Sequence, residues 1–373
     1  MDFELGEERE ALVAAVKSAL AQECPLDLVR RQVEGGARSD QPWKLAVALG
    51  WPGVAVPESC GGAGLSAVEL GLIVEAHGQH LAPGPFFTTT TQFLPCILEA
   101  GSEEQRQRFA AAAARGEKTG TLAVSGPSGR GLTPDDSLRA RPDGDGGFVL
   151  EGERHFALEA GHVDEIVSVA RVDEGDGIGL FVVPRRSVEV EAKTSLDASR
   201  ELCRIRYHGV GVGPERTLGA PGRSAAALER ALDHARVGLA LEIAGSCAGL
   251  FEIAVDYAKQ RVQFDQPIGS FQAVQHKCAD MFVALQKARA LCLFALMTLA
   301  EDDPRRRLAA SMAKAAAGDC QALVCKEAIQ IHGGTGFTWE CDVHLFVKRA
   351  KTSAALLGTA AEHRARIADL LRV

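Results

Sequence analysis

Two stretches decide the fold of this chain: Tyr257-Ala-Lys-Gln-Arg-Val-Gln-Phe-Asp-Gln-Pro-Ile-Gly-Ser-Phe-Gln272 and Gln330-Ile-His-Gly-Gly-Thr-Gly-Phe337. In the first, a helix carrying Arg261 ends in a Phe/Pro turn and a second helix begins near Gly269. The planar fork of an arginine can donate two hydrogen bonds to a phosphate. In the second, a glycine turn follows a long helix, so backbone atoms can approach a flat or anionic ligand. Taken singly, each stretch is also explained as an ordinary helix end with a cation or a glycine cap.

Three compositional zones surround these stretches. A length of 373 residues exceeds one compact core and predicts two or three domains. Residues 1–118 have helical periodicity, residues 119–222 contain short β-branched segments between turns, and residues 223–373 return to long helical segments. Helices are expected at Glu4–Gln22, Gln41–Leu49, Ala67–His80, Glu103–Ala114 and about 224–260, 270–300, 304–331 and 340–371; strands are expected at Gly147–Gly152, Glu165–Ala170, Ile178–Pro184, Val188–Ala192 and Leu202–Val212.

Composition excludes several classes of protein. The chain has 49 acidic and 41 basic residues, a net charge of −8 that argues against non-specific nucleic-acid binding. The N-terminus is acidic where a targeting peptide would be basic, and Glu242 interrupts the longest apolar stretch, at 237–251. We therefore expect a cytoplasmic protein without a membrane span. No pair of the ten cysteines has C-x-x-C spacing, so buried thiols are expected rather than a metal site.

Together, the two stretches and the helix–strand–helix order resemble the acyl-CoA dehydrogenase flavoprotein family over essentially the whole chain. Further marks are the segment Pro57-Glu58-Ser59-Cys60-Gly61-Gly62-Ala63-Gly64, the pair Asp197 and Arg200, and Asp233-x-x-Arg236. The resemblance implies an α+β protein. It would have an N-terminal helical domain at 1–118, a middle β-barrel-like domain at 119–222 and a C-terminal four-helix bundle at 223–373.

The resemblance also implies FAD as cofactor. In the family, the ADP half of FAD reaches a neighbouring subunit, where an R-x-x-F segment and a Gln-x-x-Gly-Gly turn receive it. Asp265 stands where the family usually has glycine, a modest departure because Asp tolerates unusual φ. Asp233 and Arg236 would meet the CoA moiety of an acyl-CoA substrate. The cofactor-binding roles fall to Arg261, Phe264, Gln330, Gly333 and Gly334.

The family's catalytic base is missing at both of its known positions. The reaction expected of the family is α,β-dehydrogenation of an acyl-CoA thioester, in which a carboxylate removes the α-proton and the β-hydrogen leaves as hydride to the flavin. The usual Glu-Gly-Thr segment reads Leu357-Gly358-Thr359, and the alternative position holds Ala235. Neither side chain titrates, so we expect no catalytic residue in this chain.

The β domain departs from the family at the segments that meet the flavin ring. A Thr-Glu-Pro loop is replaced by Ser125-Gly126-Pro127, and a Trp-Ile-Thr/Ser segment by Phe156-Ala157-Leu158. Leu158 has no hydroxyl to offer the ring. The half-site for the neighbour's ADP moiety is therefore retained, whereas the flavin-ring site and the base are eroded.

This asymmetry leads to the main expectation: a subunit of a heteromeric acyl-CoA dehydrogenase that is active only with its partner subunit, like those of bacterial enzymes acting on steroid side-chain CoA thioesters. Its partners would be a second acyl-CoA dehydrogenase-like subunit, in a tetramer, and an electron-transferring flavoprotein. One alternative is a self-sufficient homotetramer with a base relocated to Asp233, Glu242 or Glu362. Another is a non-catalytic scaffold subunit.

Overall fold

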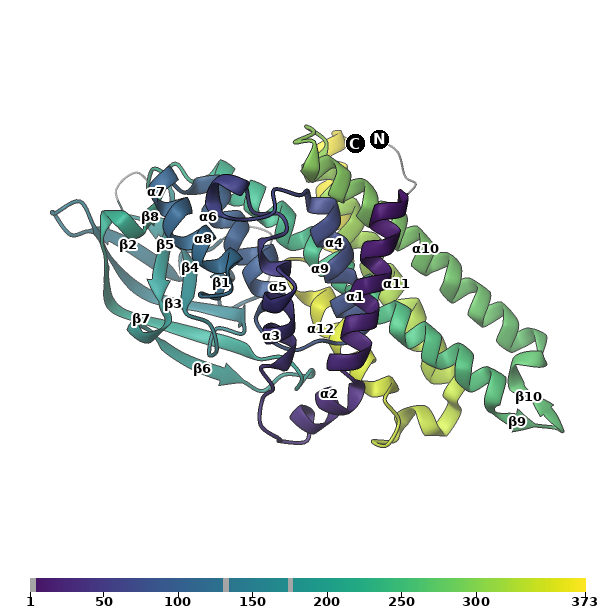
Figure 1. Ribbon diagram of the computed structural model, residues 1–373. Coiled ribbons are helices and arrows are strands. Elements are labelled where there is room, and N and C mark those ends of the chain that lie inside the picture. Colours follow the sequence, from purple (N-terminus) through teal and green to yellow (C-terminus); the bar gives the residue numbers. More distant parts are fainter. Residues whose placement is uncertain (1–4, 130–133, 174–176) are drawn as a thin grey trace. The chain divides into compact units, whose positions relative to one another are not determined.

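A computed structural model describes residues 5–129, 134–173 and 177–373 (Figure 1). The chain packs as two compact units, one built from residues 1–39, 71–83 and 236–373, the other from residues 40–70 and 84–235. Two helices, α4 (Ala67–Gln79) and α9 (Ala225–Gln260), contribute residues to both units. The expected start of the first helix at Glu4 lies outside the described residues. The division into three domains stays a prediction.

The first unit is helical. Besides parts of α4 and α9, it contains α1 (Glu7–Glu23), α2 (Leu26–Val33), α10 (Gln272–Ala300), α11 (Arg306–His332), α12 (Val343–Ala355) and α13 (Ala360–Leu371). Small residues let these helices approach closely. A Cβ at Gly78 would lie 2.5 Å from the carbonyl oxygen of Glu242, and one at Gly245 would lie 2.0 Å from that of Glu75. The backbones of α4 and α9 thus meet at positions that only glycine fits.

The last predicted helix, 340–371, is wrong as a single element, because the chain breaks between α12 and α13. Leu357 and Gly358 have φ of +51° and +100°, values that no helix interior adopts. Thr359 then caps α13: its hydroxyl accepts a bond from the Glu362 amide at 3.3 Å, and the Glu362 carboxylate accepts one from the Thr359 amide at 2.8 Å. The family's base segment therefore lies on a short link between two helices.

The second unit joins short helices to a sheet. Its helical segments are α3 (Gln41–Ala48), α5 (Phe86–Thr88), α6 (Leu94–Ala100), α7 (Glu103–Gln105) and α8 (Ala111–Ala114), together with the first residues of α4 and α9; π-helical turns at Thr89–Phe93 and Arg106–Ala110 join α5 to α6 and α7 to α8. The strands are β1 (Gly120–Ala123), β2 (Leu138–Pro142), β3 (Phe148–Leu158), β4 (Glu165–Val172), β5 (Ile178–Pro184), β6 (Glu189–Lys193), β7 (Leu202–Val212) and β8 (Thr217–Leu218).

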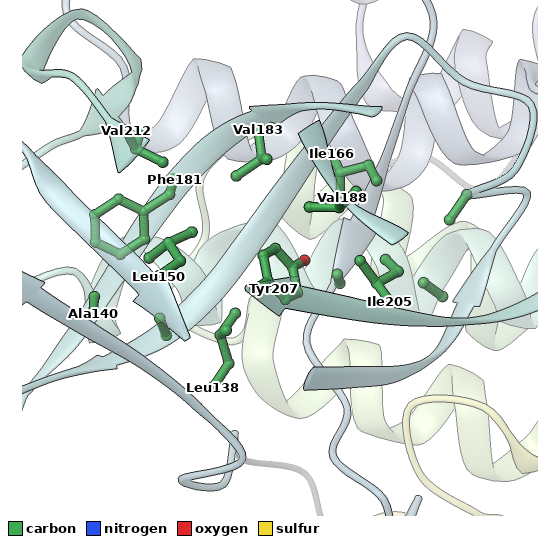
Figure 2. Packing of buried hydrophobic residues seen from close by; sticks show 14 of the residues in the cluster. Leu138, Ala140, Leu150, Ile166, Phe181, Val183, Val188, Ile205, Tyr207 and Val212 are labelled. Atoms are coloured by element: carbon green, nitrogen blue, oxygen red, sulfur yellow. The ribbon is translucent and has the colours of Figure 1, made fainter. Parts of the chain in front are cut away.

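These eight strands form one sheet in the order β6-β7-β3-β2-β4-β5-β8, with β1 parallel to β4. Figure 2 shows the apolar core among the strands, where Leu150, Phe181 and Ile205 are fully buried. The hydroxyl of the buried Tyr207 meets that of Ser168 at 2.7 Å, so its polar end is satisfied. The predicted order of helical, sheet and helical regions is confirmed, although β1, β2 and β8 were not foreseen and β3 extends beyond Gly152.

Two helices pass a length-and-hydropathy test for membrane spans. They are α9 and α10, whose most apolar windows are 83% and 44% buried inside the structure. The expectation from the sequence concerned uninterrupted apolar runs, which a test of mean hydropathy does not address, so the absence of a membrane span stays a prediction. Such a result is weak evidence for a span, since the core helix of a globular protein passes the same test.

Candidate functional site

The end of α9 leads into a small hairpin that carries the predicted phosphate-binding arginine. Strands β9 (Val262–Gln263) and β10 (Gln266–Pro267) pair antiparallel around a two-residue loop, and the hairpin projects beyond the ends of the long helices (Figure 1). Both loop residues, Phe264 and Asp265, have positive φ, +55° and +62°. This is the geometry of a type I′ hairpin turn, which Asp adopts readily and Phe does not. Asp265 thus adopts the positive φ that an aspartate was expected to tolerate at this position.

Phe264 is both strained and exposed. The residue is 86% exposed, and its ring has an edge contact with that of Phe271, with centroids 6.1 Å apart. Arg261, at the base of the hairpin, is also exposed, and its carbonyl accepts a 2.8 Å bond from the amide of Ile268. A bulky residue held at positive φ without burial gains nothing within its own chain, which points to a function outside it.

The glycine turn begins where α11 ends. Gly333 has φ +59° and ψ −138°, and its amide donates to the carbonyls of Ile329 and Gln330. Gln330, Gly333 and Gly334 are exposed, and open space lies over both glycines, because a Cβ there would meet nothing within 4 Å. The turn therefore presents bare backbone to an incoming ligand, as predicted from its glycines.

Tyr257 joins the two stretches. Its ring stacks on that of His332, with centroids 4.3 Å apart, and its hydroxyl lies 3.2 Å from that of Thr335. His332 is fixed in turn by a 2.8 Å bond between Nδ1 and the carbonyl of Ala328. The end of α9 and the glycine turn thus lie side by side. Sequence reasoning missed this role for Tyr257, although the residue heads the quoted stretch.

Lys314 organises the link that holds the empty base position. Its Nζ donates to the carbonyls of Ala354, at 3.0 Å, and Gly358, at 2.9 Å. The side chain is fully buried, and burial lowers the pKa of Lys314 to about 7. Nothing in the sequence singles out this lysine, which follows Ala313 on an alanine-rich helix.

His363 reaches the same link from α13. Its Nε2 lies 3.0 Å from the carbonyl oxygen of Leu357, so the ring donates there. Burial, together with the nearby charges of Lys314 and Arg236, lowers the pKa of His363 to about 3. The carbonyl of Leu357 is thus bonded by His363, and its own half-buried side chain is apolar.

The other predicted positions on α9 are buried. Ala235 is 0% exposed, Asp233 3% and Arg236 1%. The charge of Arg236 helps to lower the pKa of Lys314 and of His363, the two residues that bond to the Leu357 link. The CoA-binding roles of Asp233 and Arg236 stay predictions.

The two altered segments of the β domain lie together. The amide of His155 donates to the carbonyl of Ser125 at 2.9 Å, and Gly129 packs so closely on Phe156 that a Cβ would lie 2.7 Å from the ring. Leu158 is 2% exposed, and its carbonyl already accepts a 2.8 Å bond from the Thr121 hydroxyl. The segment therefore brings no polar side chain to a flavin ring.

Glu242 and Glu362, two candidates for a relocated base, have structural partners. Glu242 is 3% exposed; it accepts a 2.8 Å bond from the Ser353 hydroxyl and lies 3.7 Å from the guanidinium of Arg349. Glu362 belongs to the cap of α13. Among the residues that the structure describes, no group of three or more His, Cys, Asp or Glu side chains is arranged to hold a metal ion.

Comparison with known proteins agrees with this arrangement. The family models for the N-terminal and C-terminal domains of acyl-CoA dehydrogenases match residues 6–117 and 224–371. The acyl-CoA dehydrogenase IpdE2 of Mycobacterium tuberculosis is 30% identical over 94% of this chain and 93% of its own length.

Solved structures extend the likeness to the whole fold. The ChsE4–ChsE5 complex from Mycobacterium tuberculosis has a chain with a TM-score of 0.90 and 25% identity, covering 100% of this chain and 99% of that one. The Tcur3481–Tcur3483 steroid ACAD has a chain with a TM-score of 0.88 and 29% sequence identity, and the match covers 99% of each chain. The chain belongs to the acyl-CoA dehydrogenase family, whose cofactor is FAD.

Proposed function

We propose that this chain is the subunit of a heteromeric acyl-CoA dehydrogenase that receives the ADP half of FAD, while a second acyl-CoA dehydrogenase-like subunit supplies the base and the flavin-ring site. The observation that carries the proposal is the pair of empty base positions. Leu357 is held on a link by Lys314 and His363, and Ala235 is fully buried on α9. Neither side chain can accept the α-proton of a thioester.

The residues for the ADP half fit their role. FAD, when bound, supplies the acceptor for the β-hydrogen as hydride. What this chain contributes is binding: the exposed Arg261 can pair with a diphosphate, the ring of Phe264 can cover a flat group, and the amides of the Gly333 turn can meet an anion. Contact between the Phe264 ring and a neighbouring subunit's cofactor would offset the backbone strain at this residue.

A second subunit is supported by two further observations. Both structural relatives described above are named as pairs of proteins, ChsE4 with ChsE5 and Tcur3481 with Tcur3483. The helical unit also exposes large apolar side chains that a tetramer would bury, at Val262, Phe264, Phe282, Val283, Phe337 and Trp339. An electron-transferring flavoprotein as acceptor and a cytoplasmic location belong to the same proposal.

The self-sufficient homotetramer is the second candidate, and the environments of two of its three candidate bases, Glu242 and Glu362, weaken it. Glu242 is committed to a buried network with Arg349 and Ser353, and Glu362 is committed to a helix cap. Lys314 has no access to a substrate because it is fully buried. The hypothesis of a non-catalytic scaffold is weakened because the turn at Gly333 still leaves open space for a ligand.

The deciding experiment compares the chain purified alone with the chain co-expressed with each acyl-CoA dehydrogenase-like protein that its neighbouring genes are found to encode. The proposal expects flavin and turnover only in the co-purified complex. Full FAD content and turnover by the chain alone would overturn it in favour of the homotetramer. A co-purified complex that turns over normally when Arg261 is replaced by Ala would favour the scaffold.

Arg261→Ala and Phe264→Ala are the informative variants of the complex. Each is expected to lower flavin retention during gel filtration without changing the unfolding midpoint, because both side chains are exposed. Arg31→Ala is a matched control, since this arginine is 68% exposed in the same unit and lies outside the predicted site. Equal flavin retention in Arg261→Ala and Arg31→Ala would contradict the assigned role.

A further inference from the structure

A cationic pocket lies in the sheet-containing unit, apart from every residue assigned above. It has a volume of about 510 Å³ and is lined by the segment that runs from the π-helical turn at Arg106–Ala110 to β1, the beginning of β4, the end of β5 and the turn before β8. Five cationic side chains line it, at Arg108, Lys118, Arg185, Arg186 and Arg216, together with the carboxylates of Glu117, Asp164 and Glu165. In a chain of net charge −8, such a concentration of cations is unusual.

The three carboxylates are already engaged. Glu117 is held by Arg115, whose Nε lies 2.7 Å from it, and this hydrogen bond lowers the pKa of Glu117. Asp164 accepts from the Thr119 amide at 2.9 Å as well as from Lys118 at 3.3 Å. Their charges are therefore matched within the chain.

Glu165 is matched by Arg216, and this pair shapes the pocket wall. The guanidinium of Arg216 lies 2.8 Å from the Glu165 carboxylate and donates to the carbonyl of Val182 at 3.2 Å. It also lies 5.5 Å from the ring centre of Phe109, while Arg108 lies 5.1 Å from the same ring. Phe109 thus fixes two arginines at one edge of the pocket.

Three arginines are left without a carboxylate. Among the described residues, Arg108, Arg185 and Arg186 form no ion pair. The Nε of Arg185 is in addition buried with no hydrogen-bond partner, although the backbone amide of the same residue is fixed by a 2.9 Å bond to the carbonyl of Asp164. A buried donor without a hydrogen bond is destabilising, so the Nε of Arg185 favours an acceptor from outside the chain.

We propose that this pocket binds an oligophosphate, a ligand with at least two phosphate groups. Planar guanidinium groups match phosphate oxygens with paired hydrogen bonds, and Arg185 and Arg186 supply two adjacent forks. The volume exceeds that of a single phosphate and lies in the range of small-ligand sites. Either a free diphosphate or the diphosphate of a nucleotide supplies this chemistry.

The test is isothermal titration of the intact protein with pyrophosphate and with ADP at low ionic strength. Arg185→Gln and Arg186→Gln are each expected to weaken pyrophosphate binding about tenfold or more. Arg139→Gln is the matched control, because Arg139 is a half-exposed arginine of the same sheet that pairs with Asp173. Tighter binding of ADP than of pyrophosphate identifies a nucleotide; equal binding identifies the diphosphate alone.

Arg261→Ala separates this pocket from the proposed FAD half-site. Pyrophosphate binding should persist in Arg261→Ala and weaken in Arg185→Gln, whereas flavin retention by the complex should show the reverse. Absence of pyrophosphate binding up to about 10 mM, or equal binding by Arg185→Gln and Arg139→Gln, overturns the proposal. Unfolding midpoints that match wild type establish that each variant is folded.

Discussion

The buried ammonium group of Lys314 donates a 2.9 Å hydrogen bond to the carbonyl oxygen of Gly358, in the link where the family carries its catalytic glutamate. A second bond, of 3.0 Å, runs to Ala354 at the end of α12. The neutral amine of lysine has two N–H groups, one for each carbonyl. The lysine can therefore lose its extra proton without losing either bond, and this fits a pKa lowered by burial to about 7.

Lys314→Met should destabilise the chain by about 2 kcal/mol, because it leaves two carbonyls in the link without their donor. Urea unfolding at neutral pH measures this. Lys259→Met is the control, since that lysine is 70% exposed and should change stability by less than about 0.5 kcal/mol. An unchanged midpoint in Lys314→Met would show that the link does not depend on these bonds.

The lowered pKa of Lys314 also leads to a prediction of how stability changes at alkaline pH. Its folded pKa of about 7 lies below the unfolded value near 10.4, so between these values the unfolded chain binds more protons. Its contribution to stability therefore rises as pH increases from about 7 to 10, by up to about 1.4 kcal/mol per pH unit. Between pH 7 and 10, the free energy of unfolding should therefore rise more steeply with pH in wild type than in Lys314→Met, as urea unfolding at each pH would measure.

His363→Gln tests the acid side. The folded pKa of about 3 lies below the value of 6.5 for histidine in an unfolded chain, so the stabilisation from neutral His363 is complete above pH 6.5 and is lost as pH falls towards 3. Gln can still donate to the Leu357 carbonyl but does not titrate. The variant should therefore lose less stability than wild type between pH 6.5 and 4.

His77 continues to titrate in that experiment, because burial lowers its pKa to about 4. The acid slope of His363→Gln should thus be reduced rather than abolished. His208→Gln, at a 67% exposed side chain, is the control and should keep the wild-type slope. Identical acid slopes in all three proteins would contradict the assignment to His363.

Glu242→Gln distinguishes a structural from a catalytic carboxylate. Glu242 and Arg349 are buried together, and removing one partner of such a pair typically costs about 3–5 kcal/mol. The variant should unfold at lower urea, and Glu191→Gln, at an exposed pair with Arg206, should change stability by at most about 1 kcal/mol. A normally stable Glu242→Gln protein with turnover reduced about 100-fold would identify a relocated base instead.

The sequence carries enough to predict the regular fold and the exposed half of the site. Two local sequence patterns predicted it, the glycines at 333 and 334 and the segment from Arg261 to Phe264. In the structure, the glycines form an open turn and the segment forms part of a tight hairpin. The break at Leu357 was also locally encoded, by Gly358 and the cap spacing of Thr359 and Glu362. Apolar periodicity on both sides of the break hides it.

Long-range contacts could not be predicted in this way. Lys314 is 40 residues from Ala354 in sequence, and a lysine on a helix is ordinarily solvent-exposed. The same holds for Tyr257, whose contact with Thr335 spans 78 residues, and for the pocket around Arg185, which collects residues from four separate segments. Burial of such side chains is a property of tertiary packing.

Leu357→Ala tests the division of labour directly. If the partner subunit supplies the base, turnover of the complex should stay within about twofold of wild type, because the leucine contributes only packing. The isolated chain should lose at most about 2 kcal/mol of stability, since the side chain is half-buried. Replacing the partner's base carboxylate with an amide should instead reduce turnover by at least about 100-fold. A large loss of turnover in Leu357→Ala, with stability and flavin content unchanged, would mean that this link faces a reacting substrate after all.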